Sequence, residues 1–497
     1  MSLFSLSTGQ ARSRLVHAGF VFLAGALVAG CGNGYRPAIT PINPSGPASQ
    51  ATSYTAVISS PGQNLPGVAT VIDYSGDTIM ALAPIGPNPL SFTLDATGGN
   101  GYTVNSDGTL TNFPVSTNLQ QRLVQYTTLP ASAGIVNLFS PSAGLWGVDV
   151  NGDVADVLTG FPATFKLSIP MAPTPVAIVG PASTGQRNYV IAQNFTDSSG
   201  VACNLSPRTA IKNGEADAVE TASDTISARL TVGKCPVYGV MTPDQRRAFV
   251  LNRGDDTITV INSQINAIDS CTPFLNQSGQ LVTCHPSLPL STSAGLTGAN
   301  VPAIAGPVYA EYNTTTSQLI VADYDGNAIS VIDVSLDEYG NDSPTFGTTF
   351  TIPVGANPAS VTALYDGSRA FTANQTDGTV SIVNLSSHTV EKTLPVNGHP
   401  RTVVSTQNSI YGKVYASSPD SPYLNIIRTD QDIIDTNVLV QGNIVDVRVT
   451  TQNGSQGNTN ITSRKPGYGE PCYLPPAQMV SQYGANYTLA DCQTIPQ

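Results

Sequence analysis

The chain is short of charge, of helix-forming stretches and of long apolar runs. Only 11% of its 497 residues are Asp, Glu, Lys or Arg, whereas Gly occurs 45 times and Pro 37 times. Stretches rich in Glu, Lys, Leu and Ala, from which helices form most readily, are missing. After the N-terminal region no segment approaches 18 continuous apolar residues, so no membrane-spanning helix is expected there. These absences exclude a helical bundle and favour an all-β, turn-rich protein.

Cationic residues are outnumbered, because 21 Lys and Arg face 33 Asp and Glu, for a net charge of −12. Nucleic acid as a partner is therefore not expected, since its phosphates require Lys and Arg. A basic patch for anionic membranes is not expected either. Histidine is scarce, with four residues in the whole chain, and the C-x-x-C spacing is absent. A structural zinc site is therefore a weak interpretation of the cysteines.

The N-terminus is built like an export signal. Basic Arg12 and Arg14 precede an apolar segment, 18–29, that is too short to span a bilayer. It ends in Leu-Val-Ala-Gly-Cys31, which resembles the lipobox of bacterial lipoproteins. The resemblance implies a signal peptide over 1–30, a lipid on Cys31, and a place in the bacterial cell envelope. Because Gly32 rather than Asp follows, the outer membrane is favoured. An ordinary signal peptide is the alternative.

Removing Cys31 leaves an even set of cysteines, which in an exported protein predicts disulfides. Neighbour order suggests three local bridges, Cys203–Cys235, Cys271–Cys284 and Cys472–Cys492, although six cysteines allow 15 connectivities. The composition of residues 31–51, which are rich in Pro, Ser and Gly, predicts a flexible tether. Residues 451–497 read as a tail stapled by its own disulfide.

A repeat of about 42 residues organises residues 52–450. Each copy holds four short alternating segments between turn residues, as in the stretch from Pro358 to Val396. Four antiparallel strands at a period of ~40–50 residues predict a β-propeller blade. The copies are expected to open at Pro89, Pro130, Pro175, Pro236, Pro307, Pro358, Pro400 and Asn443. Pairing of 444–449 with the N-terminal strands would close the ring at eight blades, with seven as the alternative.

The segments Ala248-Phe-Val-Leu-Asn252 and Arg369-Ala-Phe-Thr-Ala-Asn374 resemble the YVTN-type propeller repeat, most clearly over 236–443. Tyr-Val-Thr-Asn itself is absent. The resemblance implies a propeller and says little about activity, because this architecture carries many functions. Family members include surface-associated proteins, and lactonases and quinone-dependent dehydrogenases share the architecture.

Function in a propeller often gathers on the face that carries the turns between the second and third strands and the inter-blade loops. The insert 194–213 is expected there, and the insert 263–303 close to it. The insert 335–346 is expected on the opposite face. Long inserts of this kind are often functional.

Two groups of residues are candidates for binding. His399 and Arg401 lie at an inter-blade loop, where they could bind an anion or polarise a carbonyl. Asp149, Asn151, Asp153 and Asp156 have some likeness to a calcium loop. However, Asn151-Gly152 also fits the hairpin turn that each blade needs.

The sequence as a whole predicts a non-enzymatic binding module, lipid-anchored in the envelope. Its ligand would be a protein, a glycan or a small molecule held on the loop-rich face. No complete catalytic constellation is recognised, and no cofactor other than calcium is suggested. A propeller enzyme of the lactonase or quinone-dependent type and a purely structural envelope protein are the alternatives.

Overall fold

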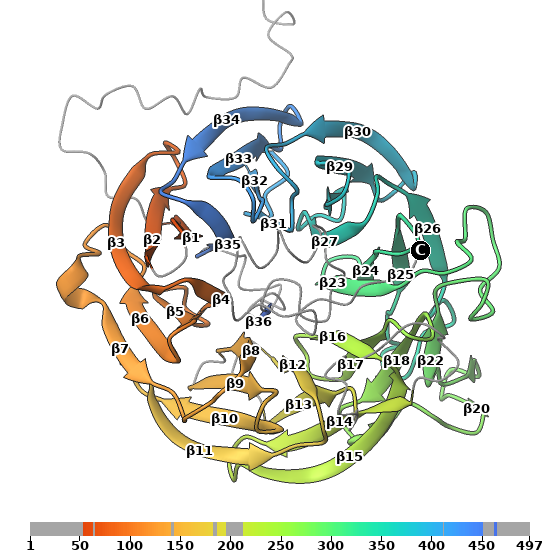
Figure 1. Cartoon of the computed structure of the whole chain (residues 1–497). Coiled ribbons are helices and arrows are strands. Elements are labelled where there is room, and N and C mark those ends of the chain that lie inside the picture. The colour runs from red at the N-terminus through yellow and green to blue at the C-terminus, as the bar shows by residue number, and fades with distance from the viewer. Residues whose placement is uncertain are drawn as a thin grey trace, which may run out of the picture. The chain divides into compact units, whose positions relative to one another are not determined.

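A computed structural model shows a ring of eight four-stranded antiparallel blades (Figure 1). The structure describes residues 53–62, 65–140, 144–181, 186–194, 212–410 and 412–450, together with the backbone of 462–464. The predicted signal peptide, the tether and most of the tail lie outside these ranges. No helix in the described part is long and apolar enough to cross a membrane.

The first four blades, each given from its inner to its outer strand, have the following bounds. Blade 1 contains β35 (Asn443–Val449), β1 (Tyr54–Ser60), β2 (Pro66–Asp73) and β3 (Ile79–Pro87). Blade 2 contains β4 (Pro89–Leu94), β5 (Asn100–Asn105), β6 (Thr109–Pro114) and β7 (Gln125–Thr128), with a 3-10 turn η1 (Gln121–Leu123) before β7. Blade 3 contains β8 (Ile135–Phe139), β9 (Leu145–Asp149), β10 (Val154–Thr159) and β11 (Thr164–Pro170). Blade 4 contains β12 (Pro175–Val179), β13 (Arg187–Ala192), β14 (Asn213–Glu220) and β15 (Thr225–Lys234).

Blade 5 differs because its outer strand is split. It contains β16 (Pro236–Met241), β17 (Arg247–Asn252) and β18 (Thr257–Asn262), flanked by β19 (Ala267–Ile268) and β22 (Ser287–Pro289). Between these two pieces lies a hairpin of β20 (Phe274–Leu275) and β21 (Leu281–Val282).

The last three blades return to the regular pattern. Blade 6 contains β23 (Pro307–Asn313), β24 (Gln318–Asp323), β25 (Ala328–Asp333) and β26 (Thr349–Pro353). Blade 7 contains β27 (Pro358–Ala363), β28 (Arg369–Asn374), β29 (Thr379–Asn384) and β30 (Thr389–Pro395). Blade 8 contains β31 (Thr402–Ser405), β32 (Lys413–Ser417), β33 (Tyr423–Arg428) and β34 (Ile433–Leu439). A short strand, β36 (Thr462–Arg464), is added to the inner edge of blade 3.

The two ends of the ring meet in blade 1, which confirms the predicted closure and the count of eight. β35 pairs antiparallel with β1, with Val447 opposite Val57. Five of the expected opening prolines begin an inner strand, whereas Pro130 and Pro400 lie a few residues before β8 and β31.

The core lies between blades, where alternate apolar side chains of neighbouring sheets interlock. Phe92 and Phe113 stack at 6.0 Å between ring centroids in one such layer. Trp146, in the core between blades 3 and 4, is 3% exposed.

The asparagine that ends the second strand holds the following turn. In blades 2, 5 and 7 its Nδ2 donates to two hydroxyls of the third strand, at 2.7–3.1 Å; these asparagines are Asn105, Asn252 and Asn374. A Cβ on Gly355 would lie 2.6 Å from Nδ2 of Asn374, so glycine is required beside it. The Asn of the YVTN-like motif is therefore a structural residue of the blade.

In blades 2, 4, 5 and 7 the residue before the opening proline adopts a left-handed backbone. Its φ is +42° at Asn88, +57° at Thr174, +49° at Cys235 and +54° at Asn357. Asn tolerates this region better than β-branched Thr. In several blades the carbonyl of this residue accepts the N–H of the residue after the second strand, as Cys235 does from Arg253 at 3.0 Å. The bond fixes the inter-blade loop to the turn of the next blade.

Candidate functional site

The loop-rich face is built from the turns after the second strand and the inter-blade loops. An aspartate in the turn accepts an N–H from the loop that enters the same blade: Asp255 from Lys234 at 3.0 Å, and Asp377 from Ala356 at 2.6 Å. These carboxylates are thus used to fix the loops in place.

His399 lies on this face and forms a pair with Asp420. The Asp420 carboxylate accepts the backbone N–H of His399 at 2.8 Å, and its other oxygen lies 2.6 Å from Nδ1 of the imidazole. The His399 side chain is 38% exposed, so a ring oriented by a carboxylate is presented to solvent. Asp420 lies in the turn between β32 and β33, and no sequence motif marks it as a partner of His399.

Arg401, the predicted companion of His399, is buried at 5% exposure. Its backbone N–H donates to the carbonyl of Ser417 at 2.9 Å. The exposed part of the predicted pair is therefore the histidine, and the residue beside it is a carboxylate.

The four residues of the predicted calcium loop serve separate parts of the blade. Asp149 accepts three backbone N–H groups within the turn and its neighbouring loop, at 2.9–3.1 Å, and Asp153 accepts the N–H of Thr174 at 2.8 Å. Asp156 accepts the Ser168 hydroxyl at 2.6 Å, and Asn151 donates to the carbonyl of Ser132 at 3.0 Å. Among the described residues no group of three His, Cys, Asp or Glu could hold a metal ion.

One predicted disulfide, Cys271–Cys284, is present, with 5.5 Å between its Cα atoms. Cys235 is fully buried and disulfide-bonded. Its predicted partner Cys203 lies outside the described residues, as do Cys472, Cys492 and Cys31. Those pairings and the lipid site stay predictions.

The predicted place of the Cys271–Cys284 segment was wrong. The insert interrupts the outer strand itself, between β19 and β22, and does not extend the inter-blade loop. It therefore contacts the insert 335–346, which belongs to the turns of the opposite face: Asn276 donates to Asp337 at 3.3 Å, and Ser278 to Glu338 at 3.5 Å. Only residues 290–306 reach the loop-rich face, where Leu290 donates to the carbonyl of Asp256.

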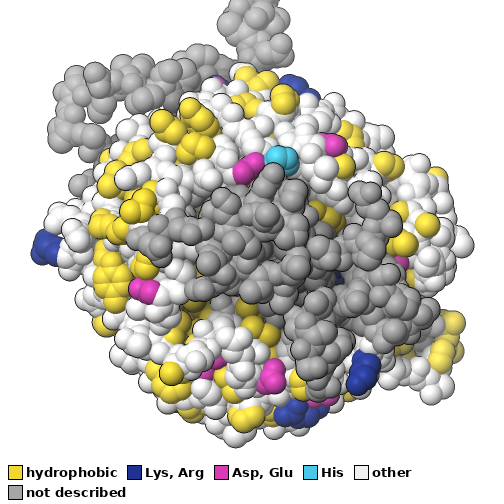
Figure 2. All heavy atoms as spheres, in the orientation of Figure 1, with side chains coloured by type: hydrophobic (Ala, Val, Ile, Leu, Met, Phe, Trp, Pro, Cys, Tyr) yellow, Lys and Arg dark blue, Asp and Glu magenta, His cyan; other side chains and the backbone are white. Residues whose placement is uncertain are grey.

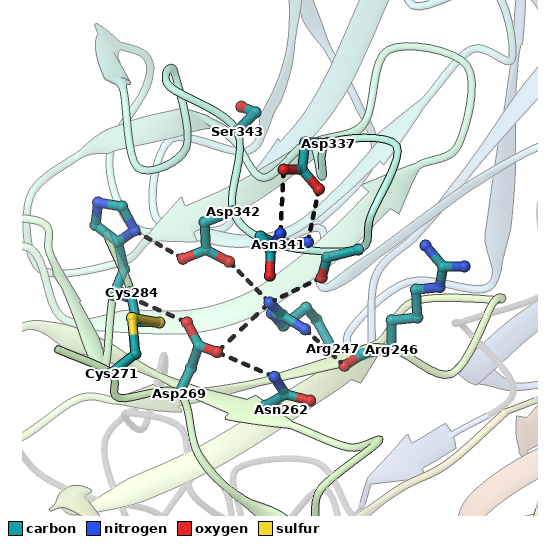
Figure 3. A network of polar contacts seen from close by, with 12 residues as sticks. Arg246, Arg247, Asn262, Asp269, Cys271, Cys284, Asp337, Asn341, Asp342 and Ser343 are labelled. Atoms are coloured by element: carbon teal, nitrogen blue, oxygen red, sulfur yellow. Dashed lines mark hydrogen bonds and ion pairs between the residues drawn. A yellow bond between two sulfur atoms is a disulfide. The ribbon is translucent and has the colours of Figure 1, made fainter. Parts of the chain in front are cut away.

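A buried polar network joins the two inserts (Figure 3). Arg247, 2% exposed, donates to Asp342 at 3.0 Å and lies 3.5 Å from Asp269. His285 approaches Asp342 with Nδ1 at 2.8 Å and donates its backbone N–H to Asp269 at 3.1 Å. Its ring stacks on Phe346 at 5.1 Å.

The pKa values of the two carboxyl groups in this network, Asp269 and Asp342, are shifted in opposite directions. Burial acts to raise the pKa of Asp342, but the hydrogen bonds from His285 and Arg247 and the charge of Arg247 outweigh it, so the pKa lies below its usual range. For Asp269 burial prevails over the charge of Arg247, and its pKa is raised. Arg247 and Asp342 are 95 residues apart in the chain, so no local pattern could have predicted this network.

A second polar group links blades 5, 6 and 7 on the loop-rich face. Arg253 is fully buried and makes a forked contact with Asp325, with N–O distances of 3.0 and 3.3 Å. Its guanidinium lies 5.7 Å from the ring centre of Tyr324, whose hydroxyl donates to Gln375 at 3.0 Å. Successive turns are thereby locked together.

A third group of polar and aromatic side chains lies on the inner strands. The rings of Tyr238 and Tyr309 stack at 4.8 Å, and Arg448 donates to Asp446 at 2.8 Å. Burial acts to lower the pKa of Arg448, but the interactions with Asp446 and the two tyrosines raise it by more. The pKa is therefore above its usual value, and the guanidinium stays charged.

Comparison with solved structures supports the fold. The apo form of AztD from Citrobacter koseri is 10% identical, with a TM-score of 0.54 over 80% of this chain and 98% of that one. The dihydro-heme d1 dehydrogenase NirN is 12% identical, with a TM-score of 0.55 over 84% of this chain and 80% of that one. At such identity the likeness concerns the fold alone. No family model matches the chain, and no curated protein sequence matches it.

Proposed function

We propose that this propeller is a non-enzymatic binding module that holds its ligand on the loop-rich face, beside His399. The observation that carries the proposal is the His399–Asp420 pair, in which a half-buried carboxylate orients an imidazole that is 38% exposed. Such a ring can exchange hydrogen bonds with a polar ligand at little entropic cost, because its orientation is already set.

The surface charge agrees with a polar rather than a polyanionic ligand. On the face in Figure 2 the Lys and Arg side chains are few and separated, as the net charge of −12 leads one to expect. A sugar, a small carbonyl compound or a protein loop fits this surface better than nucleic acid.

A thermal-shift screen of the soluble chain from residue 32, with sugars, lactones, quinone cofactors and calcium, tests the proposal. A ligand at 100 times its dissociation constant adds about 2.7 kcal/mol to the free energy of unfolding. His399→Ala and Asp420→Asn are expected to weaken the hit at least about tenfold, which corresponds to ~1.4 kcal/mol.

His388→Ala is the matched control, because His388 lies in a turn between the third and fourth strands, on the other face. If the three variants His399→Ala, Asp420→Asn and His388→Ala bind the ligand with equal affinity, the ligand binds elsewhere. Turnover of a lactone, with loss of rate in the same variants, would replace the binding proposal by the enzymatic one.

We also propose that Cys31 carries a lipid that anchors the protein in the bacterial envelope, on the outer membrane. The lipobox-like end of the signal supports this proposal. Radiolabelled palmitate should be incorporated by the natural chain and not by Cys31→Ala. Equal labelling of the two chains would contradict it.

A further inference from the structure

The inner strands of a propeller present open edges to the central channel. An open edge exposes backbone N–H and C=O groups that need partners. In three blades a side chain of the preceding blade supplies one: Asn137 accepts the N–H of Ile178 on β12 at 3.3 Å, Glu311 that of Ala363 on β27 at 3.2 Å, and Ser360 that of Val403 on β31 at 3.0 Å.

The inner edge of β8 is closed in another way, by a backbone strand. β36 pairs antiparallel with it, with Thr462 opposite Phe139, Ser463 opposite Leu138, and Arg464 opposite Asn137. The same strand also lies near β4 and β12. In Figure 1 it lies at the centre of the ring, beside the inner strands.

This strand is not part of the ring. β35 has already closed blade 1 at Val449, and residues 450–461 separate it from β36. The propeller is complete without the tail, so β36 is an added occupant of an edge that the ring itself leaves open.

Asn137 lies on β8, opposite Arg464 in the pairing with β36. Its side chain is fully buried, and its Nδ2 has no hydrogen-bond partner in the described structure, although its Oδ1 is used by Ile178. A buried donor without an acceptor is unusual in folded proteins. The backbone of Thr462–Arg464, which already lies along this edge, leaves this donor unpaired.

We propose that the inner edge of β8 is an acceptor site for an extended peptide, and that Thr462–Arg464 occupies it in the absence of the partner. Recognition would run through main-chain hydrogen bonds to residues 135–139, as in strand addition to other open sheets. The partner is an extended polypeptide segment without proline at its paired positions. This inference stands apart from the His399 site and does not depend on it.

A peptide-binding experiment on two chains tests the proposal. One chain covers residues 32–497 and the other 32–450, and the ligand is a fluorescent peptide of residues 457–467. The shorter chain is expected to bind the peptide at least about tenfold more tightly, because in the longer chain the tethered strand competes at an effective concentration near millimolar. Amide hydrogens of residues 135–139 should exchange faster in the shorter chain and regain protection when the peptide binds.

Peptides with Thr462→Pro or Ser463→Pro are the controls. Successive N–H groups point to opposite sides of a strand, so one of the two substitutions should abolish binding and the other should be milder. A full-length chain carrying both substitutions provides a second test, should the shorter chain fold poorly. Its residues 135–139 should lose protection while circular dichroism stays unchanged.

Two results would overturn the inference. One is that the amide hydrogens of residues 135–139 exchange at the same rate in the 32–497 chain and in its variant with both proline substitutions. The other is peptide binding that leaves exchange at 135–139 unaltered, because the peptide would then sit elsewhere. Loss of the His399 ligand has no bearing on either readout, so the two proposals fail separately.

Discussion

The end of the second strand shows how one side chain sets the local stability of a blade. Three blades place Asn there, with its Nδ2 shared between hydroxyls. Blade 6 places Asp323 there, which accepts the Ser330 hydroxyl at 2.6 Å and is fully buried. Burial raises the pKa of Asp323 well above its ordinary value, and the hydrogen bond from Ser330 opposes it only in part.

Asp323→Asn is therefore expected to stabilise the protein at neutral pH. At a pH above about 4, Asp323 has lost its proton in the unfolded chain but still holds it in the folded chain. Folding of the protein with Asp323 therefore becomes less favourable as the pH rises. The gain should be absent at pH 3.5 and reach about 1–3 kcal/mol at pH 8, the usual range for an uncompensated buried polar group. Chemical denaturation at both pH values measures it. Asn374→Asp, the reverse change at the equivalent site, should destabilise, and a stabilising effect would contradict the argument.

Arg247 and its neighbour Arg246 offer a matched pair of cations. Arg247 is buried between Asp342 and Asp269, whereas Arg246 is 40% exposed with Asp244 at 3.7 Å. Arg247→Met should cost about 3–5 kcal/mol, because it leaves buried carboxylates without their cation. Arg246→Met should stay within about 0.5 kcal/mol. Equal denaturation midpoints for the two variants would show that the buried network adds nothing.

The split outer strand of blade 5 is the element that departs most from the repeat. Its insert leaves the sheet after β19 and returns at β22, and Cys271–Cys284 closes the excursion. The hairpin at its end exposes Leu275 and Leu281, at 69% and 61%. The order of this element thus depends on its disulfide and on the polar network at its base.

Replacing both cysteines by serine should loosen the insert and leave the ring intact. The bridge closes a loop of 13 residues, for which chain entropy predicts about 3 kcal/mol. We expect faster amide exchange over residues 269–286 and unchanged exchange in β17 and β18. Because the bridge restricts the unfolded chain, the free energy of global unfolding should fall by no more than this amount. Faster exchange throughout blade 5 would show instead that the insert supports the whole blade.

At the scale of the molecule, blade 1 decides whether the ring stays closed. β35 contributes four buried apolar side chains: Ile444, Val445, Val447 and Val449. At about 1.5–3 kcal/mol each, they match the whole stability of a typical domain. A chain ending at residue 442 should therefore lose cooperative unfolding, whereas one ending at 450 should keep it. Calorimetry of both chains checks this, and similar melting of the two would refute closure through β35.

The pH dependence of the whole ring follows from its buried carboxyls. Burial raises the pKa of Asp217 to about 7, and also raises the pKa of Asp156 and Asp323. Each contributes stability that falls as pH rises from about 4 towards its folded pKa. Asp342, with a lowered pKa, acts in the opposite sense and loses its contribution in acid. We expect maximum stability between about pH 4 and 6, and a lower melting temperature at pH 8.

Asp217→Asn should flatten the part of that profile between pH 4 and 7. The carboxyl of Asp217 accepts the N–H of Ala172 at 2.7 Å, so an asparagine whose oxygen faces Ala172 preserves this bond. A profile that keeps its slope in the variant would assign the effect to other carboxyls.

The sequence by itself determined the all-β class and the four-stranded repeat, and it favoured eight blades over seven, closed by the terminal strands. Strand alternation, turn residues and the spacing of prolines are local properties, and each blade repeats them. Neighbour order also suggested the Cys271–Cys284 bridge, which the structure confirms, since that pair is close in the chain.

Only the tertiary structure decided which polar groups meet. Asp420 beside His399, Arg247 between Asp269 and Asp342, and β36 against β8 join residues that are 21 to more than 300 positions apart. Such contacts depend on how neighbouring blades pack and on where an insert leaves its strand. A local pattern carries no information on either. This is why the sequence placed the disulfide insert on the wrong face and did not reveal Asp420 as the partner of His399.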